Sequence, residues 1–361
     1  MHKSIFISDI HLNRYEGKAL YASDYTWLSS AQNQHLVAFL KSLLSQDVQT
    51  LAILGDLFDD WIHPVDTQPP TMAQIAAANQ DVVGALNDLR KRGVDLVYVR
   101  GNHDMTVSGA ELQQIFPPAI GSFQFFDEGV YQDGTIHGEH SHTYCLFNAP
   151  DPTRFDRLPI GYYLSRLFAT HASKATPPQI PDRRLDYEFH SLLNIDEKIA
   201  TAFDILFLDN VLIRFLNAAG IDKNQNIGIA MPDGSNISIE KVRLAFKNLR
   251  SRWQGPDSAS EAIAADCNRL LPVAEQILQN EPTTDVVLLG HSHIPDIQRY
   301  RGKVYANTGA WCHDPDAGYF VEVIRHADED AGKSTVQLWK WANDMRQNVA
   351  KPLEPNPIPF G

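Results

Sequence analysis

The chain has 361 residues, of which 43% are hydrophobic and 10% aromatic, and its formal net charge is -13. This length is sufficient for a large hydrophobic core and for two domains. The acidic balance lacks the basic footprint of proteins that hold nucleic acid by its phosphates, so a nucleic-acid partner is not expected.

The sequence shows no pattern typical of export or membrane insertion. The apolar run at the N-terminus is too short for a signal peptide, and no uninterrupted run of about 18 apolar residues predicts a membrane span. Charged residues interrupt the longest candidate, 203–220, which favours a buried helix. The widely spaced Cys145, Cys267 and Cys312 form no disulfide framework. We therefore expect a cytoplasmic protein without a membrane span.

The first hundred residues alternate between strand and helix patterns. Strand patterns lie at 4–8, 49–54 and 94–100, and helix patterns at 30–45 and 72–92. This order predicts a parallel sheet with right-handed crossovers. Short strands joined by glycine turns follow, up to about residue 140.

The pattern changes after about residue 150. Helical patterns lie at 160–170, 187–219, 239–253 and 258–279, with breaks that contain proline and glycine. A buried strand returns in "TTDVVLLGHSH", and shorter strands follow it. The sequence therefore predicts a core over 1–150 and 283–345, interrupted by a mostly helical insertion over 151–282. The proline-rich end, 346–361, is expected to be an irregular tail.

Polar clusters that can bind metals or move protons follow the predicted core strands. They contain Asp9, His11, Asp56, Asp59, Asn102, His103, Asp104, His137, His291 and His293. In open α/β sheets, sites form outside the carboxyl ends of the strands. Taken singly, such a cluster has an ordinary explanation as a turn or a helix N-terminus. Five of them in order, each at a strand end, predict a single functional site.

The spacing within the clusters indicates a metal site. Residues i and i+2 of an extended chain point to the same side, so Asp9 and His11 can face one ion, as can His291 and His293. Asp56 can bridge two ions through its two oxygens. Mixed carboxylate, imidazole and amide ligands suit ions such as Mn, Fe and Zn.

The order D-x-H, G-D-x-x-D, G-N-H-D, H-G and G-H-x-H resembles the calcineurin-like metallophosphoesterase superfamily, and "NTGAW" at 307–311 is similar to a motif of that family. The resemblance covers about 1–150 and 283–345 and reaches the insertion only weakly. It implies an α/β fold in which two sheets pack face to face with helices outside, an αββα sandwich. It also implies two divalent metal ions, Mn²⁺ in the first place, with Fe, Zn or Mg as alternatives.

The resemblance also implies a role for each site residue. The first ion would take Asp9, His11, Asp56 and His293, and the second would take Asp56, Asn102, His137 and His291. His137 is preferred to the nearby His140 and His142 because it directly precedes Gly138 at a strand end, as in the family. His140 is expected to face substrate or solvent. His103 would stand beside the leaving group, with Asp104 holding its ring.

The implied reaction is hydrolysis of a phosphodiester, phosphomonoester or pyrophosphate by a metal-bound hydroxide. "GDLFDDWI", "IHGE" and "NTGAW" look most like the UDP-2,3-diacylglucosamine hydrolase branch, which favours a phosphorylated small molecule or a lipid-linked nucleotide as substrate. The chain differs from that branch by His103, where arginine is typical, and by a longer insertion. The alternatives are a nuclease, a protein or cyclic-nucleotide phosphatase, or a non-catalytic scaffold of the same superfamily. The insertion is expected to form a cap that sets substrate choice and contributes no metal ligand.

Overall fold

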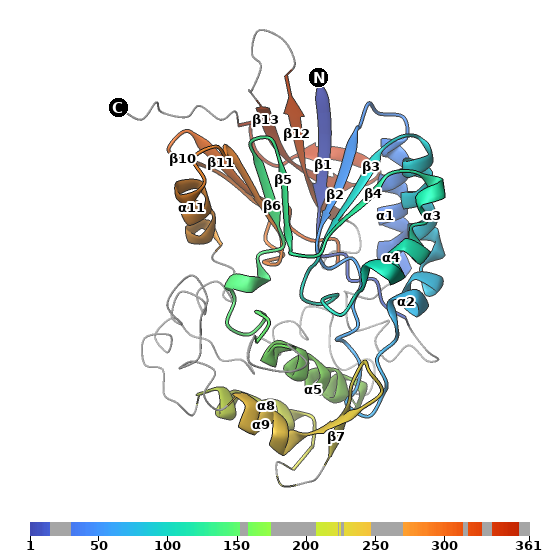
Figure 1. Cartoon of the computed structure of the whole chain (residues 1–361), viewed down its shortest axis with the longest axis vertical. Coiled ribbons are helices and arrows are strands. Elements are labelled where there is room, and N and C mark those ends of the chain that lie inside the picture. The colour runs from blue at the N-terminus through green and yellow to red at the C-terminus, as the bar shows by residue number, and fades with distance from the viewer. Residues whose placement is uncertain are drawn as a thin grey trace.

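The computed structural model describes residues 1–14, 30–151, 158–174, 207–222, 224, 227–246, 270–312, 317–326 and 334–353. Within these ranges two β-sheets face each other, and helices cover both outer sides (Figure 1). The predicted αββα sandwich is confirmed.

The larger sheet contains all the strands predicted in the first hundred residues. Its order is β14 (Met345–Asn348), β13 (Ser334–Ala342), β12 (Ala317–Arg325), β1 (His2–Ile7), β2 (Thr50–Leu54), β3 (Asp95–Val99) and β4 (Phe123–Phe126). Strands β1 to β4 run parallel, as the alternation of strands and helices predicts, and β12 pairs with β1 antiparallel.

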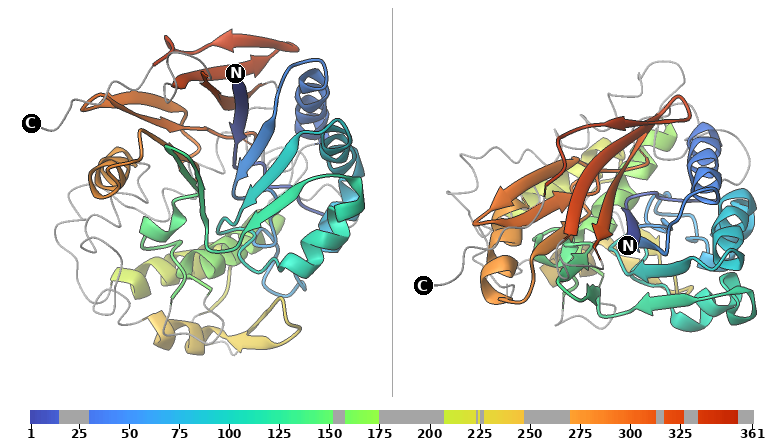
Figure 2. Two further views of the ribbon diagram at one scale, coloured as in Figure 1. Left: turned by 45° about the horizontal axis from the view of Figure 1, so that its top comes forward. Right: turned by 90° about the horizontal axis from the view of Figure 1, so that it is seen from above.

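The smaller sheet has three parallel central strands between antiparallel edges. Its order is β10 (Asp296–Tyr300), β11 (Lys303–Asn307), β9 (Val286–Leu289), β6 (Ile136–Glu139) and β5 (Val130–Asp133). Figure 2 shows the two sheets facing each other, so that the carboxyl ends of β1, β2, β3, β6 and β9 approach one region.

The apolar strands bury both of their faces. In β2, Leu51 and Ile53 belong to the core under the helices, whereas Ala52 and Leu54 belong to the core between the sheets. In β9, Leu288 lies between the sheets and Leu289 faces the opposite side, where α11 (Leu271–Asn280) packs. Burial on both faces explains why these strands read as continuous apolar runs.

Helices α1 (Ser30–Leu43), α2 (Met72–Ala78), α3 (Gln80–Lys91) and α4 (Gly109–Ile115) cover the larger sheet. The single helix expected over 72–92 is divided at Asn79. The Asn79 side-chain amide donates to the carbonyl oxygens of Ile75 and Asn13, each at 2.8 Å. Asparagine side chains that bond to nearby backbone compete with helix formation, which accounts for the break.

Two predicted domain boundaries are placed differently in the structure. Helix α11, assigned to the insertion, packs on β9 and β11 as the outer layer of the smaller sheet. Strand β14 pairs with β13, and Leu353 forms a bridge with Val336, where an irregular tail was expected. We therefore propose that the core resumes before α11 and extends at least to Leu353.

The described part of the insertion has a core of its own. It comprises α5 (Ile160–Lys174), α8 (Phe207–Ala218), α9 (Ile239–Phe246) and a hairpin of β7 (Gly228–Ala230) and β8 (Asn236–Ser238). The hairpin was not predicted, and the predicted helical residues 187–206, 247–253 and 258–269 lie outside the described residues. Figure 1 shows these elements below the ends of both sheets.

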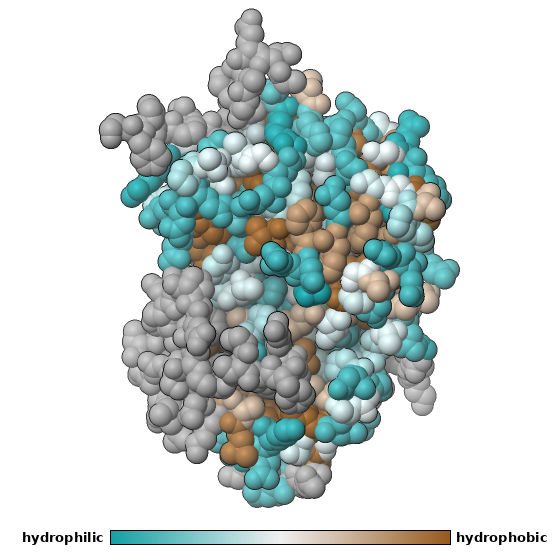
Figure 3. Space-filling model, viewed as in Figure 1, coloured by the Kyte–Doolittle hydropathy of each residue, from teal (hydrophilic) through white to brown (hydrophobic). Residues whose placement is uncertain are grey.

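The apolar stripe of α5 faces inward. Ile160, Tyr163, Leu164, Leu167 and Phe168 are all buried in the core of the insertion. On the face shown in Figure 3, hydrophilic and hydrophobic residues are intermixed over the described part of the chain. No helix among the described residues is long and apolar enough to cross a membrane.

Arg166 of α5 joins the insertion to the core. It is fully buried and donates to the carbonyl oxygens of His63 (2.6 Å), Pro64 (2.7 Å), Thr67 (2.6 Å) and Ala230 (2.7 Å). A guanidinium group with five N–H donors can satisfy several backbone carbonyls at once. Arg166 therefore fixes α5 and β7 to the loop after β2.

Candidate metal centre

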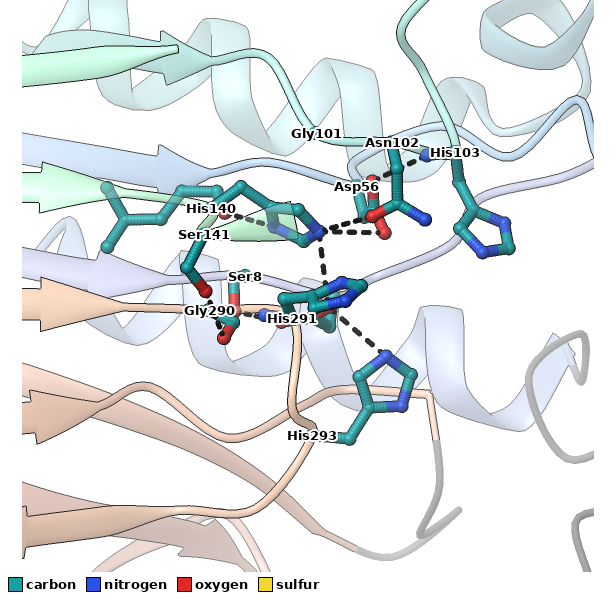
Figure 4. Close-up of polar contacts among 12 residues, drawn as sticks. Ser8, Asp56, Gly101, Asn102, His103, His140, Ser141, Gly290, His291 and His293 are labelled. Atoms are coloured by element: carbon teal, nitrogen blue, oxygen red, sulfur yellow. Dashed lines mark hydrogen bonds and ion pairs between the residues drawn. The ribbon is translucent and has the colours of Figure 1, made fainter. Parts of the chain in front are cut away.

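Four of the five predicted polar clusters converge on one site between the carboxyl ends of the strands (Figure 4). Asp9 and His11 follow β1, Asp56 follows β2, and Asn102 follows β3. His291 and His293 follow β9 from the other sheet. All of these side chains are buried or nearly so, so the charges they carry face each other and not bulk water.

One group of side chains surrounds Asp9. Its Oδ1 lies 3.1 Å from His293 Nε2 and 4.0 Å from His11 Nε2. The two imidazole nitrogens are 3.3 Å apart, and His11 Nε2 is 3.7 Å from Asp56 Oδ2. Asp9 Oδ1 is buried and accepts no hydrogen bond from the described residues. Carboxylate oxygens and imidazole nitrogens directed at one point form a donor set that fits a divalent cation.

A second group lies on the other side of Asp56. His140 Nε2 is 3.1 Å from Asp56 Oδ2 and 2.9 Å from Asn102 Oδ1. The other ring nitrogen of His140, Nδ1, lies 2.7 Å from the Leu54 carbonyl oxygen. A carbonyl oxygen can only accept, so Nδ1 carries a proton, and Nε2 is the ring nitrogen that could bind a metal after losing its own proton. The His291 ring lies 5.1 Å from the His140 ring, between centroids.

His137, predicted as a ligand, lies away from the other predicted ligands in the structure. His137 Nδ1 lies 3.0 Å from Glu281 Oε2, at the end of α11, and Nε2 lies 3.5 Å from Glu139 Oε1. Successive residues of a strand point to opposite faces, so His137 points to the outer face of β6 while Gly138 packs against Leu54 between the sheets. His140 follows the strand end and is placed beside Asp56. We therefore propose His140 as the ligand in place of His137.

This proposal predicts different behaviour for two histidine variants. His140→Ala should weaken binding of one of two Mn²⁺ ions by about tenfold or more, since even partners of metal ligands contribute that much. His137→Ala should leave both binding steps unchanged, because the ring is paired with Glu139 and Glu281. Isothermal titration calorimetry with Mn²⁺ measures both. The reverse pattern would restore His137 to the ligand set.

Asp59 contacts two histidines of the site, and no individual role was predicted for it. Its Oδ2 lies 3.0 Å from His11 Nδ1 and 3.0 Å from His103 Nδ1, so one carboxylate orients both rings. Its Oδ1 accepts from the backbone N–H of Trp61 at 2.8 Å. The G-D-x-x-D motif contains Asp59, but an acidic residue there is also typical of a helix N-terminus, so the pattern alone did not distinguish the two roles.

Asp104, expected to hold the His103 ring, forms its hydrogen bonds elsewhere. Its carboxylate accepts from the backbone N–H of Leu57 (2.9 Å) and Gly101 (2.8 Å) and from the Tyr98 hydroxyl. Burial and the nearby Asp56 raise the pKa of Asp104 to about 7. We therefore propose that Asp104 ties the loops after β2 and β3 together and that Asp59 orients the His103 ring.

The charges of the site depend on each other. Burial alone would raise the pKa of Asp9, but the imidazoles of His293 and His140 outweigh it and lower that pKa. Burial would lower the pKa of His140, whereas Asp56 and Asp9 raise it to about 10. Because a ligand imidazole must be deprotonated, an ion that binds His140 Nε2 displaces a firmly held proton. Metal binding at this position is therefore coupled to proton release.

The backbone at the site is strained. Five proposed ligands adopt left-handed conformations: Asp9 (φ 54), His11 (φ 54), Asp56 (φ 53), His291 (φ 70) and His293 (φ 59). The left-handed region costs a residue with a side chain about 1 kcal/mol or more. Such strain persists where the surrounding structure imposes it, and it is concentrated at functional sites.

Two glycines make the close approach of the ligands possible. Gly55 has φ +87, and a Cβ atom there would lie 2.5 Å from His140 Cγ. A Cβ atom at Gly101 would lie 2.1 Å from Asp56 Oδ1. Any larger residue at these positions would therefore displace Asp56 or His140.

Comparison with known protein families gives a match over most of the chain. The family model of the calcineurin-like phosphoesterases matches residues 2–295. UDP-2,3-diacylglucosamine hydrolase of Neisseria gonorrhoeae is 28% identical over 107 residues, 30% of this chain and 36% of that protein. The enzyme of that name from Hamiltonella defensa is 28% identical over 139 residues, 38% and 45% of the two chains. This chain thus spans less than half the length of these curated relatives.

Solved structures are similar at a lower level. A dimetal phosphatase from Danio rerio covers 98% of both chains, with 12% identity and a TM-score of 0.43. The nuclease MPE from Pseudomonas putida is 22% identical, with a TM-score of 0.22, over 42% of this chain and 57% of its own.

Proposed function

This chain belongs to the calcineurin-like phosphoesterase family, and we propose that it is a metal-dependent hydrolase of a phosphoric ester or pyrophosphate. The observation that carries the proposal is the position of Asp56 between two groups of ligands. Its Oδ2 lies 3.7 Å from His11 Nε2 on one side and 3.1 Å from His140 Nε2 on the other. A carboxylate so placed suits a site with two metal ions.

The proposed ligands divide into two sets that share Asp56. The first ion would be held by Asp9, His11, Asp56 and His293, and the second by Asp56, Asn102, His140 and His291. When bound, two divalent ions supply Lewis acidity and lower the pKa of water towards neutrality. We propose Mn²⁺ as the native ion because the ligand set mixes carboxylate, imidazole and amide groups, with Fe, Zn and Mg as alternatives.

His103 is the proposed proton donor to the leaving oxygen. It follows the ligand Asn102, and its side chain retains slight exposure at the edge of the buried cluster. Burial would lower the pKa of His103, but Asp59 outweighs it and raises that pKa. The imidazolium form is thereby favoured. Asp59 holds Nδ1, so that Nε2 is the nitrogen available to protonate an alkoxide.

The proposed substrate has a phosphorylated part and a larger organic part, as in UDP-2,3-diacylglucosamine. The names of the relatives and the position of the insertion below the sheet ends support this class. The apolar stripe of α5 is buried in the core of the insertion, so an acyl chain would be met by other residues. The insertion would act as a cap that sets substrate choice.

A reducing, cytoplasmic environment is part of the proposal. The cysteines Cys145, Cys267 and Cys312 are widely spaced in the sequence and give no disulfide framework. A low cysteine content without such a framework is typical of proteins that are kept reduced.

A substrate panel tests the proposal. Wild type would be assayed with bis(p-nitrophenyl) phosphate, p-nitrophenyl phosphate, 3′,5′-cyclic AMP, single-stranded DNA and UDP-2,3-diacylglucosamine, each with Mn²⁺, Fe²⁺, Zn²⁺ or Mg²⁺. We expect hydrolysis of the lipid-linked pyrophosphate and of the chromogenic diester, with DNA uncleaved because of the acidic net charge. Absence of metal-dependent turnover on every substrate would instead favour a non-catalytic scaffold.

A further inference from the structure

The indole of Trp61 lies against the imidazole of His103. The two rings are stacked, with centroids 4.3 Å apart and an interplanar angle of 26°. Trp61 is fully buried, and His103 is 8% exposed. The stacked face is therefore closed to solvent, and the position of the imidazole depends on that of the indole.

Trp61 also contacts the insertion. The Tyr162 ring of α5 meets the indole edge to face, with centroids 5.8 Å apart at 89°. A Cβ atom on Gly161 would lie 3.3 Å from the indole, so α5 also approaches it with its backbone. Trp61 is part of the same apolar cluster as α5, α8 and α9. One side chain thus connects the core of the insertion to the proposed proton donor.

The contacts of His103 constrain its ring in complementary ways. The carboxylate of Asp59 holds Nδ1 at 3.0 Å, yet a ring held at one atom can still tilt about that contact. The edge of His11, with centroids 4.6 Å apart at 84°, limits one direction. The indole of Trp61 covers a face and limits the tilt. Because Asp59 also accepts from the backbone N–H of Trp61 at 2.8 Å, both constraints come from one turn.

We propose that Trp61 is a positioning residue that directs His103 Nε2 towards the leaving oxygen and makes this alignment depend on the docking of the insertion. The proposal rests on the proposed function, in which His103 donates that proton. According to this proposal, the insertion helps to align His103 through Trp61, in addition to setting substrate choice. A disturbance of the contact between Tyr162 and Trp61 would then alter the chemical step as well as binding, whereas a change deeper in the core of the insertion would not.

The kinetic test compares Trp61→Leu and Trp61→Phe with Phe215→Leu. Phe215 belongs to the same apolar cluster on α8 and lies outside the proposed catalytic groups. Assays would use bis(p-nitrophenyl) phosphate and a diester with an alkyl leaving group. Trp61→Leu should lower kcat for the alkyl diester by about 10-fold, since a small misalignment of a reacting group slows chemistry strongly. It should change kcat for the nitrophenyl ester less, leave KM similar and retain both metal ions.

Trp61→Phe should recover most of the alkyl-diester rate because it keeps an aromatic face against His103. Phe215→Leu should lose thermal stability comparably to Trp61→Leu, with kcat unchanged on both substrates. If the two leucine variants lower kcat equally, or if Trp61→Leu affects both substrates alike, Trp61 only fills the core and the proposal fails.

A second readout needs no turnover. In protein labelled with ¹³C-histidine, the ring protons of His103, assigned by their loss in His103→Asn, should resonate upfield because of the ring current of Trp61. Trp61→Leu should move them downfield, and Phe215→Leu should not. A shift change in a protein that hydrolyses no substrate would refute the proposed function and leave the stacking intact. Unchanged His103 signals in Trp61→Leu would overturn the positioning role.

Discussion

Asp56→Asn should lower turnover by about 10³-fold or more and reduce the bound metal, because two ions together supply several kcal/mol of transition-state stabilisation. Asp56 is the carboxylate shared by both ligand groups, so its loss affects both ions. Asparagine keeps the Oδ1 atom that accepts from the backbone N–H of His103 at 2.9 Å. It also tolerates the left-handed backbone at this position, φ 53, better than most residues. The variant should therefore fold.

Metal content by mass spectrometry and thermal unfolding with and without Mn²⁺ separate the two effects of Asp56→Asn. Without metal, the variant should be less stable than the wild type, because it removes the buried carboxylate that attracts His140 and raises the pKa of that imidazole. Added Mn²⁺ should stabilise the wild type against unfolding much more than the variant. A variant that retains near-normal turnover with two bound ions would exclude Asp56 as the bridging ligand.

His103→Ala should retain both metal ions and lose about 10²- to 10⁴-fold in rate on a substrate with an alkoxide leaving group. The loss follows from the position of His103 after Asn102 and beside Asp59, where the ring is held but lies outside both ligand groups. A nitrophenolate leaving group needs no proton, so the loss should be smaller for bis(p-nitrophenyl) phosphate.

The comparison that decides the role of His103 uses Brønsted plots of rate against leaving-group pKa for wild type and variant. A steeper dependence in His103→Ala supports proton donation. Parallel lines, with an equal loss for every leaving group, would restrict His103 to binding the phosphoryl oxygens. Asp59→Asn is a useful companion, since it should reproduce part of the steepening by releasing Nδ1 of His103.

The positions of Asp9, Asp56, Asn102 and His291 could be predicted because parallel strands end at one edge. Each of these residues follows an apolar run long enough to be recognised as a strand, and alternation with helices makes those strands parallel. The site could therefore be located from the sequence without knowing how the side chains pack. The left-handed turns after the strands bring these side chains together. In the sequence, only the polar clusters indicated where these turns lie.

The choice between His137 and His140 depends on detail that the sequence does not contain. Strand β6 ends at Glu139. The side chain of a residue inside the strand points to one face of the sheet or the other, as its position in the alternation requires. A residue in the turn beyond the strand, such as His140, can point towards the proposed metal centre. The sequence does not show which face of β6 packs against Leu54. The same limit applies to Asp59 and Asp104, because both carboxylates are buried and only the fold decides which imidazole each one meets.

The insertion was predicted as helical from its periodicity, and α5, α8 and α9 agree with this. The β7–β8 hairpin was missed because its strands contain three residues each, too few to show alternation. Helix α11 was assigned to the insertion because its amphipathic pattern does not reveal that it packs on Tyr305 and Val287 of the smaller sheet. The hydrophobic periodicity of a helix shows which of its faces is buried, but it does not show which element packs against that face.

The left-handed ligands have a consequence for laboratory evolution of this protein. At Asp9, His11, Asp56, His291 and His293, replacement by glycine or asparagine relieves backbone strain. Selection for thermal stability alone, without selection for turnover, would enrich such replacements. The variants so obtained would have lost catalytic activity. A stabilisation campaign should therefore hold these five codons constant and sample the helices that cover the larger sheet.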